Sequence, residues 1–260
     1  MTGRRLDQEL VGRRLLPSRS AARLAILEGK VVVDGVTAKR PARRVAESAE
    51  IHLAAGTDTF VGRGAHKLLA ALDAFGFEVE GRRAVDVGAS TGGFTQVLLE
   101  HGATEVVALD VGTGQLHERL RNDPRVTVRD GTNVRHVDVA ALGSPFDVVV
   151  VDLSFISVRL ITSVLAQLGG QDTDWMVLVK PQFELGRADL GKGGVVRSAD
   201  ARFRALTTVI DTMRSAGFVI SGCAPSPVIG GSGNREALLW MRRTGRETTL
   251  EEMYKVLDDE

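Results

Sequence analysis

A glycine-rich segment, Asp86-Val-Gly-Ala-Ser-Thr-Gly-Gly93, has the residue types that most directly suggest ligand binding. Its three glycines let the backbone approach a ligand closely, because they carry no side chain. Asp86 places a carboxylate beside that ligand, which suits a cationic group better than a pyrophosphate. The Gly-x-Gly-x-x-Gly spacing of dinucleotide-binding turns, where a helix N-terminus accepts two phosphate charges, is absent. The segment therefore favours a cationic cofactor.

Two more carboxylates, Asp110 and Asp130, end the next two apolar runs of the sequence. At such a position Asp110 can accept hydrogen bonds from ribose hydroxyls, a feature that NAD enzymes share. Asp130 could accept a hydrogen bond from an adenine amino group. Together with the glycine-rich segment they predict S-adenosylmethionine as cofactor, with an NAD-dependent enzyme as the alternative. The predicted cofactor-binding residues are Asp86, Gly88, Ala89, Ser90, Gly92, Gly93, Phe94, Asp110 and Asp130.

Lys180 and Asp152 end two later apolar runs, so the sheet would deliver an ammonium and a carboxylate to one edge. A lysine held in a low-dielectric site can act as a base or can orient a hydroxyl group for attack on a methyl group. A neighbouring carboxylate would hold the lysine in position. Taken alone, Lys180 could equally be a surface lysine at a strand end, and Asp152 could equally be a cap.

Two features that the sequence lacks limit which kind of atom can be the methyl acceptor. Enzymes that methylate exocyclic amines of bases typically carry an Asn/Asp-Pro-Pro-aromatic tetrad where this sequence reads Asp152-Leu-Ser-Phe155. Methylation of cytosine C5 needs a cysteine nucleophile, and Cys223, the only cysteine, lies in a late strand away from the relevant strand ends. The expected methyl acceptor is therefore an oxygen atom.

The elements that position these side chains follow an alternating pattern from about residue 82 onward. Short β-rich runs are separated by segments of helical length, which is typical of a mostly parallel, doubly wound α/β sheet that binds ligands at the carboxyl ends of its strands. The expected strands are 85–87, 106–110, 126–128, 146–152 and 175–180. We expect a Rossmann-like class I methyltransferase domain over 82–260, preceded at 61–81 by a linker and the start of the catalytic domain.

The first 60 residues form a different pattern. Leucines and alanines recur at helical spacing over 6–15 and 21–27, with Ser18 and Gly29 as the expected caps of the second helix. A β-branched run then enters the turn Asp34-Gly35, which predicts a hairpin. This α+β order, with Arg5-Leu-Asp-x-x-Leu10 at its start, resembles the S4 RNA-binding domain, which implies contacts to the phosphates and the shape of structured RNA.

The distribution of charge supports an RNA contact in the N-terminal 60 residues. The net charge of the whole chain is zero, yet residues 1–60 hold 11 Lys and Arg against 7 Asp and Glu. A basic segment of this kind indicates contact with a polyanion, although a solvated charged surface or a small capping domain would look similar. The predicted RNA-binding residues are Arg5, Arg19, Arg23, Lys30 and Arg63.

Six motifs in order over nearly the whole chain resemble the TlyA family, whose members combine an S4 head with an FtsJ-like catalytic domain. They are Arg63-Gly-x-x-Lys67-Leu, the glycine-rich segment up to Phe94, Arg121-Asn-Asp-Pro-Arg125, Asp152-Leu-Ser-Phe-Ile-Ser157, Val179-Lys-Pro-Gln-Phe-Glu184 and Ser232-Gly-Asn-x-Glu236. The resemblance implies a catalytic set of Lys67, Asp152, Lys180 and Glu236, with Lys180 as the central base or hydroxyl-orienting group. Spacing alone could not have found Lys67 or Glu236.

The same resemblance implies 2′-O-methylation of cytidine in ribosomal RNA, of the large subunit in shorter members and of both subunits in longer ones. The tail 244–260 and the Arg121–Arg125 run favour the longer type, for which the activity implies sensitivity to capreomycin and viomycin. One departure is the linker, where Phe60 stands in place of the tryptophan of an Arg-Ala-Trp-Val-like tetrapeptide. Coupling of RNA binding to cofactor affinity through this segment is not expected to follow the family.

Composition excludes several other classes. No apolar run approaches the roughly 18 residues of a membrane helix, and the N-terminus lacks the apolar core of a signal peptide. A single cysteine excludes internal disulfides and cysteine-rich zinc sites, so we expect a cytoplasmic enzyme that needs no metal. The alternative is a non-enzymatic RNA-binding assembly factor or a pore-forming hemolysin. The basic loop 186–197 is interpreted as a substrate lid or as an ordinary connection.

Overall fold

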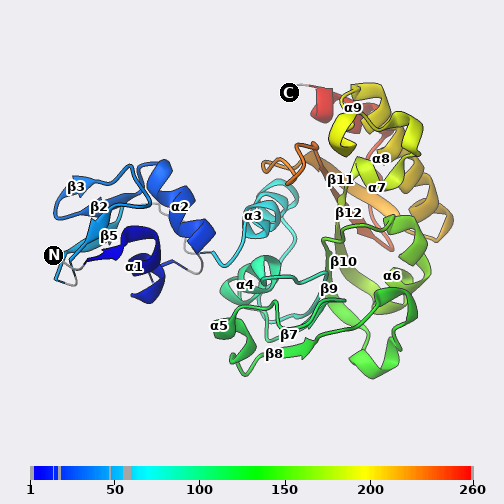
Figure 1. Ribbon diagram of the computed structural model, residues 1–260. Coiled ribbons are helices and arrows are strands. Elements are labelled where there is room, and N and C mark those ends of the chain that lie inside the picture. The colour runs from blue at the N-terminus through cyan, green and yellow to red at the C-terminus, as the bar shows by residue number, and fades with distance from the viewer. Residues whose placement is uncertain (1–2, 14, 17–18, 47, 55–59, 259–260) are drawn as a thin grey trace. The chain divides into compact units, whose positions relative to one another are not determined.

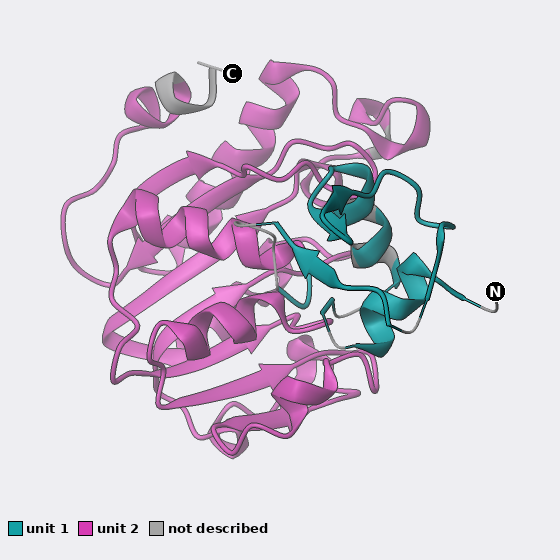
Figure 2. Cartoon of the chain, turned by 90° about the vertical axis from the view of Figure 1, so that its left-hand side faces the viewer, with its two compact units in different colours: residues 1–62 teal, residues 63–260 magenta. Residues whose placement is uncertain are grey.

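A computed structural model of the chain describes residues 3–13, 15–16, 19–46, 48–54 and 60–258. The chain divides into two compact units, Met1–Gly62 and Arg63–Glu260, which have different colours in Figure 2. Helix α3 (Gly64–Phe75) falls within the segment expected to link the domains, and it belongs to the second unit. The domain limits inferred from the sequence stay predictions.

The described residues of unit 1 form two short helices and two small antiparallel sheets. Its elements are β1 (Arg4–Arg5), α1 (Leu6–Gly12), α2 (Arg19–Leu27), β2 (Val31–Val33), β3 (Val36–Thr37), β4 (Arg44–Val45) and β5 (Ile51–Leu53). Strands β2 and β3 form the expected hairpin, in which Asp34 and Gly35 have φ values of 52° and 77°. Two consecutive residues with positive φ are typical of a type I′ turn. Strand β5 pairs with the other edge of β2, and β1 pairs with β4.

The core of unit 1 forms where the apolar faces of the two helices meet the strands. Leu6, Leu10 and Ile26 are each 0% exposed, as their helical spacing requires. Helix α1 ends earlier than the expected run to residue 15, because the N–H groups of Leu15 and Leu16 both donate to the carbonyl of Leu10. The expected cap Ser18 and linker residues 57–59 lie outside the described residues.

Unit 2 is built on a seven-stranded mixed sheet. Its strands are β6 (Arg83–Val87), β7 (Glu105–Leu109), β8 (Val126–Arg129), β9 (Phe146–Val151), β10 (Gly169–Val179), β11 (Val219–Pro225) and β12 (Ala237–Arg242). Their order across the sheet is β11-β12-β10-β9-β6-β7-β8. The β10, β9, β6, β7 and β8 strands run parallel, and β12 is antiparallel to both β10 and β11. The expected α/β class and mostly parallel sheet are confirmed.

Helices cover both faces of this sheet (Figure 1). Besides α3, the α-helices among the described residues of unit 2 are α4 (Gly93–Glu100), α5 (Glu118–Arg121), α6 (Thr162–Leu168), α7 (Pro181–Glu184), α8 (Ala199–Ser215) and α9 (Leu250–Asp258). Helices α3 and α4 pack on one face, and α6 and α8 pack on the other. The central strands are buried on both sides, which explains why β9 reads as an unbroken valine run.

The parallel strands therefore bring their carboxyl ends to one edge. That edge carries the glycine-rich loop after β6, Asp110 after β7, Asp152 after β9 and Lys180 after β10. The antiparallel β12 begins at the same edge, so that Glu236 precedes it there. Among the described residues, no helix is both long enough and apolar enough to cross a membrane.

Candidate active site

The loop between β6 and α4 passes close to the end of β9. Its backbone takes φ values of 93° at Gly88, 48° at Ser90 and 98° at Gly92. A Cβ atom at Gly88 would lie 2.5 Å from the carbonyl oxygen of Asp152, so a side chain is excluded there by contact as well as by φ. These glycines are required by the loop, which presents backbone to the edge of the sheet.

Asp86 lies beneath this loop and is 0% exposed. Its Oδ2 atom accepts hydrogen bonds from the backbone N–H of Thr95 at 2.9 Å and from the Thr95 hydroxyl at 2.7 Å, whereas its Oδ1 atom has no partner among the described residues. Burial raises the pKa of Asp86 to about 7, the bonds from Thr95 oppose the rise, and the charge of Asp152 adds to it. Asp86 thus supports the loop from below and does not line the cleft described next.

A cleft of about 760 Å³ opens between this loop and the ends of β7 and β9. Asp110 lines it, and its two carboxylate oxygens accept the N–H groups of Ser90 at 2.8 Å and Gly112 at 2.7 Å. Asp130 does not line it: its carboxylate contacts the N–H of Gly114 at 3.0 Å and Arg121 at 2.7 Å, and these contacts lower its pKa. Thr132 and Asn133 line the cleft instead.

The cleft suits S-adenosylmethionine in its chemistry. A loop that excludes a Cβ atom provides backbone donors, Asp110 provides a carboxylate for hydroxyl groups, and the buried Asp86 carboxyl favours a cation nearby. Of the predicted cofactor residues, Gly88, Ser90 and Asp110 line this cleft, and Ala89, Gly93 and Phe94 line the cavity beside it. Gly92 caps helix α4.

Four ionisable side chains form a connected chain of charges beside this cleft. Lys180 Nζ lies 2.6 Å from Asp152 Oδ1, and Lys67 Nζ lies 3.5 Å from Asp152 Oδ2 and 2.7 Å from Glu236 Oε2. The Lys67, Lys180 and Glu236 residues are 7%, 8% and 5% exposed, so the cluster is largely withdrawn from water. The structure therefore brings together all four residues of the predicted catalytic set, from α3, two strand ends and the segment before β12.

The four residues line a cavity of about 400 Å³ that shares walls with the cleft around Asp110. Gly88, Ser90, Asp152 and Phe155 line both spaces, so a group held in one space can meet a group held in the other at Asp152. Arg63 is exposed at the same cavity, where a cation suits a phosphate of a bound strand.

The segments after β9 and β10 contribute residues that the sequence analysis did not assign to the site. The Lys180 Nζ atom donates to Ser154 Oγ at 2.8 Å. Phe155 is 91% exposed, and its ring lies 5.5 Å from the ring of Phe183, measured between centroids. Exposed aromatic rings of this kind can stack on a nucleobase. The signal was present in the sequence, since each residue follows a predicted strand end within a quoted motif.

The loop 186–197 is tied to the segment before Glu236. Asn234 is 0% exposed, its Oδ1 atom accepts the N–H of Val196 at 2.8 Å, and its Nδ2 atom donates to the carbonyl of Gly194 at 3.0 Å. These bonds fix the end of the basic loop beside the cavity. Its role as a lid stays a prediction.

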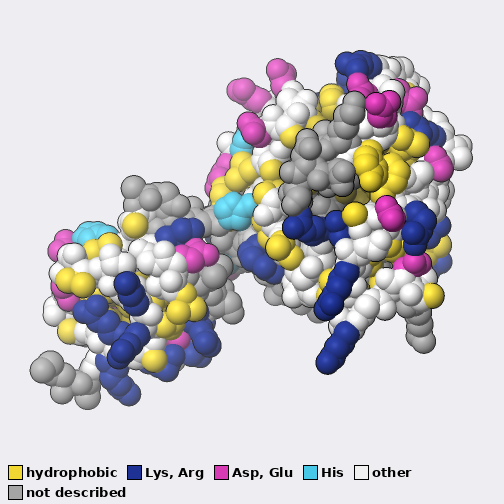
Figure 3. All heavy atoms as spheres, turned by 90° about the horizontal axis from the view of Figure 1, so that it is seen from above, with side chains coloured by type: hydrophobic (Ala, Val, Ile, Leu, Met, Phe, Trp, Pro, Cys, Tyr) yellow, Lys and Arg dark blue, Asp and Glu magenta, His cyan; other side chains and the backbone are white. Residues whose placement is uncertain are grey.

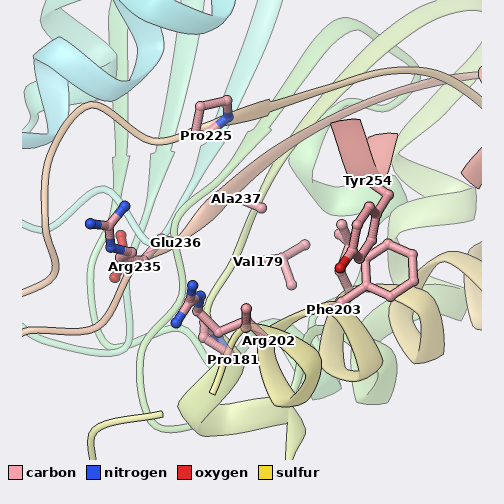
Figure 4. Close-up of a pocket in the computed structure, with 11 residues that line it drawn as sticks. Val179, Pro181, Arg202, Phe203, Pro225, Arg235, Glu236, Ala237 and Tyr254 are labelled. Atoms are coloured by element: carbon pink, nitrogen blue, oxygen red, sulfur yellow. The ribbon is translucent and has the colours of Figure 1, made fainter. Parts of the chain in front are cut away.

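Another pocket, mainly apolar, lies beside Glu236 (Figure 4). Val179 and Ala237 line it, and so do Phe203 and Tyr254, whose rings pack edge to face at 4.8 Å between centroids. Glu236 lines both this pocket and the cavity of the cluster. The volume, about 50 Å³, is too small for a nucleobase or another aromatic ring.

Two of the predicted RNA-binding residues of unit 1, Arg5 and Arg19, flank one buried carboxylate. The Asp7 side chain is 0% exposed and lies 2.8 Å from Arg5 and 3.7 Å from Arg19, and the bond from Arg5 lowers the pKa of Asp7. Arg23 is exposed, and Lys30 lies 2.9 Å from Glu28. Lys and Arg side chains cover much of the face of unit 1 shown in Figure 3.

Comparison with known proteins gives two family matches. Residues 60–243 match the FtsJ-like methyltransferase family, and residues 4–51 match the S4 domain. These matches follow the division into two units.

Individual relatives extend the match over almost the whole chain. The 16S/23S rRNA (cytidine-2′-O)-methyltransferase TlyA of Mycobacterium tuberculosis is 46% identical, over 92% of this chain and 89% of its own. Hemolysin A of Brachyspira hyodysenteriae is 37% identical, over 90% of this chain and 98% of its own. A solved structure of a Streptococcus thermophilus protein assigned as a hemolysin aligns with a TM-score of 0.78 at 34% identity, over 99% of this chain and 95% of its own.

Proposed function

The chain belongs to the TlyA family of FtsJ-like methyltransferases, and from that membership we propose that it methylates the 2′-oxygen of cytidine in ribosomal RNA. The observation that carries the proposal is the buried Lys67-Asp152-Lys180-Glu236 cluster beside the cofactor cleft. The cluster has no cysteine nucleophile, because the only cysteine, Cys223, lies in β11, and burial raises its pKa to about 12. A hydroxyl oxygen is the acceptor that an ammonium and a carboxylate serve best.

S-adenosylmethionine is the proposed methyl donor, and it supplies an electrophilic methyl group when bound. The loop around Gly88 and Ser90 would hold it through backbone groups, and Asp110 would accept hydrogen bonds from its ribose. The raised pKa of Asp86 gives the protein a carboxyl beneath the loop that ionises more readily when a cation lies near.

Lys180 is the group that would contact the substrate oxygen. Lys180 Nζ donates to Ser154 Oγ at 2.8 Å and forms an ion pair with Asp152 Oδ1 at 2.6 Å, so it lies where it can also contact a 2′-hydroxyl in the cavity. Lys180 would first pass a proton to Asp152, which leaves a neutral amine with a lone pair. That amine would accept the hydroxyl proton as the oxygen bonds to the methyl group and the bond from the methyl to the donor sulfur breaks, the sulfur keeping the electron pair. Lys67 and Glu236 hold the other oxygen of Asp152 in place. Positioned proton transfer of this kind contributes about 10²–10⁴-fold in rate.

Unit 1 would hold the RNA through phosphates while unit 2 reaches the target. The S4 match and the exposed arginines support binding to structured RNA by charge and shape. We propose ribosomal subunits, the large and also the small, as substrates, in the cytoplasm where ribosomes act. The proposal includes sensitivity to capreomycin and viomycin as a consequence of the methyl marks.

The decisive experiment uses ribosomal subunits from cells that lack the gene. Purified protein and S-adenosylmethionine with a labelled methyl group are incubated with each subunit, and the modified nucleoside is mapped by mass spectrometry. The expected product is 2′-O-methylcytidine. A methyl group on a base, or subunit binding without transfer, would contradict the proposal, and the second result would favour an assembly factor.

A further inference from the structure

The carboxylate of Glu184, at the end of α7, accepts hydrogen bonds from other residues of the protein. Its side chain is 2% exposed, and it accepts hydrogen bonds from three consecutive residues of the segment after β9. The donors are the Ser157 hydroxyl at 2.5 Å, the Val158 N–H at 2.8 Å and the Arg159 Nε at 3.0 Å. Arg159 also donates to the carbonyl of Glu184 at 3.1 Å. One residue therefore joins the segment after β10 to the segment after β9.

These bonds close a short loop at both ends. Residue 152 is held at the first end, because its N–H donates to the carbonyl of Val87 at 3.0 Å. Residues 157–159 are held at the second end by Glu184. Between the two ends lie Ser154, which accepts from Lys180, and Phe155, which is 91% exposed.

The backbone of Phe155 is in a conformation that phenylalanine rarely adopts. Its φ is 66°, in the left-handed region that favours glycine. Such a conformation persists where surrounding contacts impose it, and it is concentrated at functional sites. The exposed ring gains little from burial, so the backbone conformation depends on contacts around the loop. They are the bonds to Glu184 at the end of the loop, the Lys180–Ser154 bond and the contact of Phe155 with Phe183.

We propose that Glu184 is a positioning residue that holds the loop 152–157 so that the Phe155 ring faces the nucleobase whose sugar Lys180 contacts. This inference rests on the proposed function for the identity of the substrate. The position of the ring is a property of the protein alone. Glu184 itself touches neither cofactor nor substrate in this arrangement.

The test uses Glu184→Gln, which removes the charge and one of the two acceptor oxygens at nearly constant volume. The matched control is Glu105→Gln, because Glu105 also pairs with an arginine, Arg83, at 2.8 Å but lies at the amino end of β7. Each full-length variant is labelled with 4-fluorophenylalanine, and the resonance of Phe155 is assigned with Phe155→Leu.

The expected spectrum of Glu184→Gln has the Phe155 fluorine resonance shifted toward the value of a freely rotating ring, whereas Glu105→Gln leaves it in place. A Phe155 resonance unchanged in Glu184→Gln would overturn the proposal. This readout needs no substrate, so it stays decisive even if the protein transfers no methyl group to ribosomal subunits, a result that would contradict only the proposed function.

Kinetic measurements then test whether Glu184 affects methyl transfer by positioning Phe155. Glu184→Gln is expected to lower kcat/KM for the subunit by on the order of 10²-fold, as small displacements of positioning groups do. In a Phe155→Ala background the same change is expected to have at most a few-fold effect, because the ring it positions is gone. Equal effects in both backgrounds would show that Glu184 acts only through general stability and would overturn the positioning role.

Discussion

Lys67 Nζ lies 2.7 Å from Glu236 Oε2, although 169 positions of sequence separate the two residues. Both side chains are withdrawn from water, at 9% and 3% exposed. Their contact joins the first helix of unit 2 to the segment that enters β12, and through Lys67 it reaches Asp152. The Lys67-Asp152-Lys180-Glu236 cluster thus depends on a contact between segments far apart in the sequence of unit 2.

Replacing one member of the Lys67–Glu236 pair should destabilise the protein more than replacing both members. Glu236→Leu leaves Lys67 buried with only the 3.5 Å contact to Asp152, so we expect a loss of about 3–5 kcal/mol in the free energy of unfolding. The double variant Lys67→Met, Glu236→Leu should recover most of that loss, because no unpaired charge stays buried. Urea denaturation measures both. Methyl transfer should stay low in each variant, and full activity in the double variant would remove the pair from the mechanism.

Lys180→Ala should lower methyl transfer by about 10²-fold or more, because it removes the only group proposed to contact the 2′-oxygen. Cofactor affinity, measured by titration calorimetry, should change little, since Lys180 does not line the cofactor cleft. The control is Lys192→Ala, an exposed lysine of the loop 186–197. Normal turnover by Lys180→Ala would contradict the mechanism.

The pKa of Asp86 predicts a dependence of stability on pH. Its pKa is about 7 in the folded protein and near 4 in the unfolded chain, so between these values the folded state binds more protons. Stability from this group is therefore fully present below about pH 4, is lost as the pH rises to 7, and stays constant above. The difference between these two pKa values corresponds to a total loss of roughly 4 kcal/mol in the free energy of unfolding.

Asp86→Asn should remove this part of the pH dependence. The amide oxygen can still accept from Thr95, and the amide nitrogen takes the place of the oxygen that has no partner. Relative to the wild type, the variant should gain stability as the pH rises from 4 to 8, measured by denaturation at each pH. An equal difference in stability at both pH values would place the pKa of Asp86 near its ordinary value.

Replacing Arg19 and Arg23 with alanine should weaken RNA binding in a salt-dependent way. If each arginine contacts one phosphate, the slope of log affinity against log salt should fall by about 2 for the pair. The control is Arg214→Ala with Arg246→Ala, two arginines of unit 2 that form ion pairs with Glu247 and Glu252. A slope that does not change in the Arg19, Arg23 variant would mean that unit 1 holds RNA through other groups.

The sequence by itself determined the parts of this protein that local pattern encodes. Strands that are buried on both faces are rich in valine, so the sheet and the strand-end residues Asp152 and Lys180 could be predicted. The glycine-rich loop after β6 could be predicted as well, because a Cβ atom at Gly88 would collide with the backbone of Asp152. The hairpin at Asp34-Gly35 was predictable for the same reason, because positive φ values restrict the residue types.

Only the tertiary structure decided which distant side chains meet. Glu236 reaches Lys67 because β12 inserts antiparallel beside β10, and Glu184 reaches residues 157–159 because two strand ends lie side by side. Asp130 follows a strand end as Asp110 does, yet its carboxylate contacts Arg121 and Gly114 and does not line the cleft. Periodicity fixes which face of an element is buried, whereas such long-range contacts depend on how the elements pack, which local spacing does not specify.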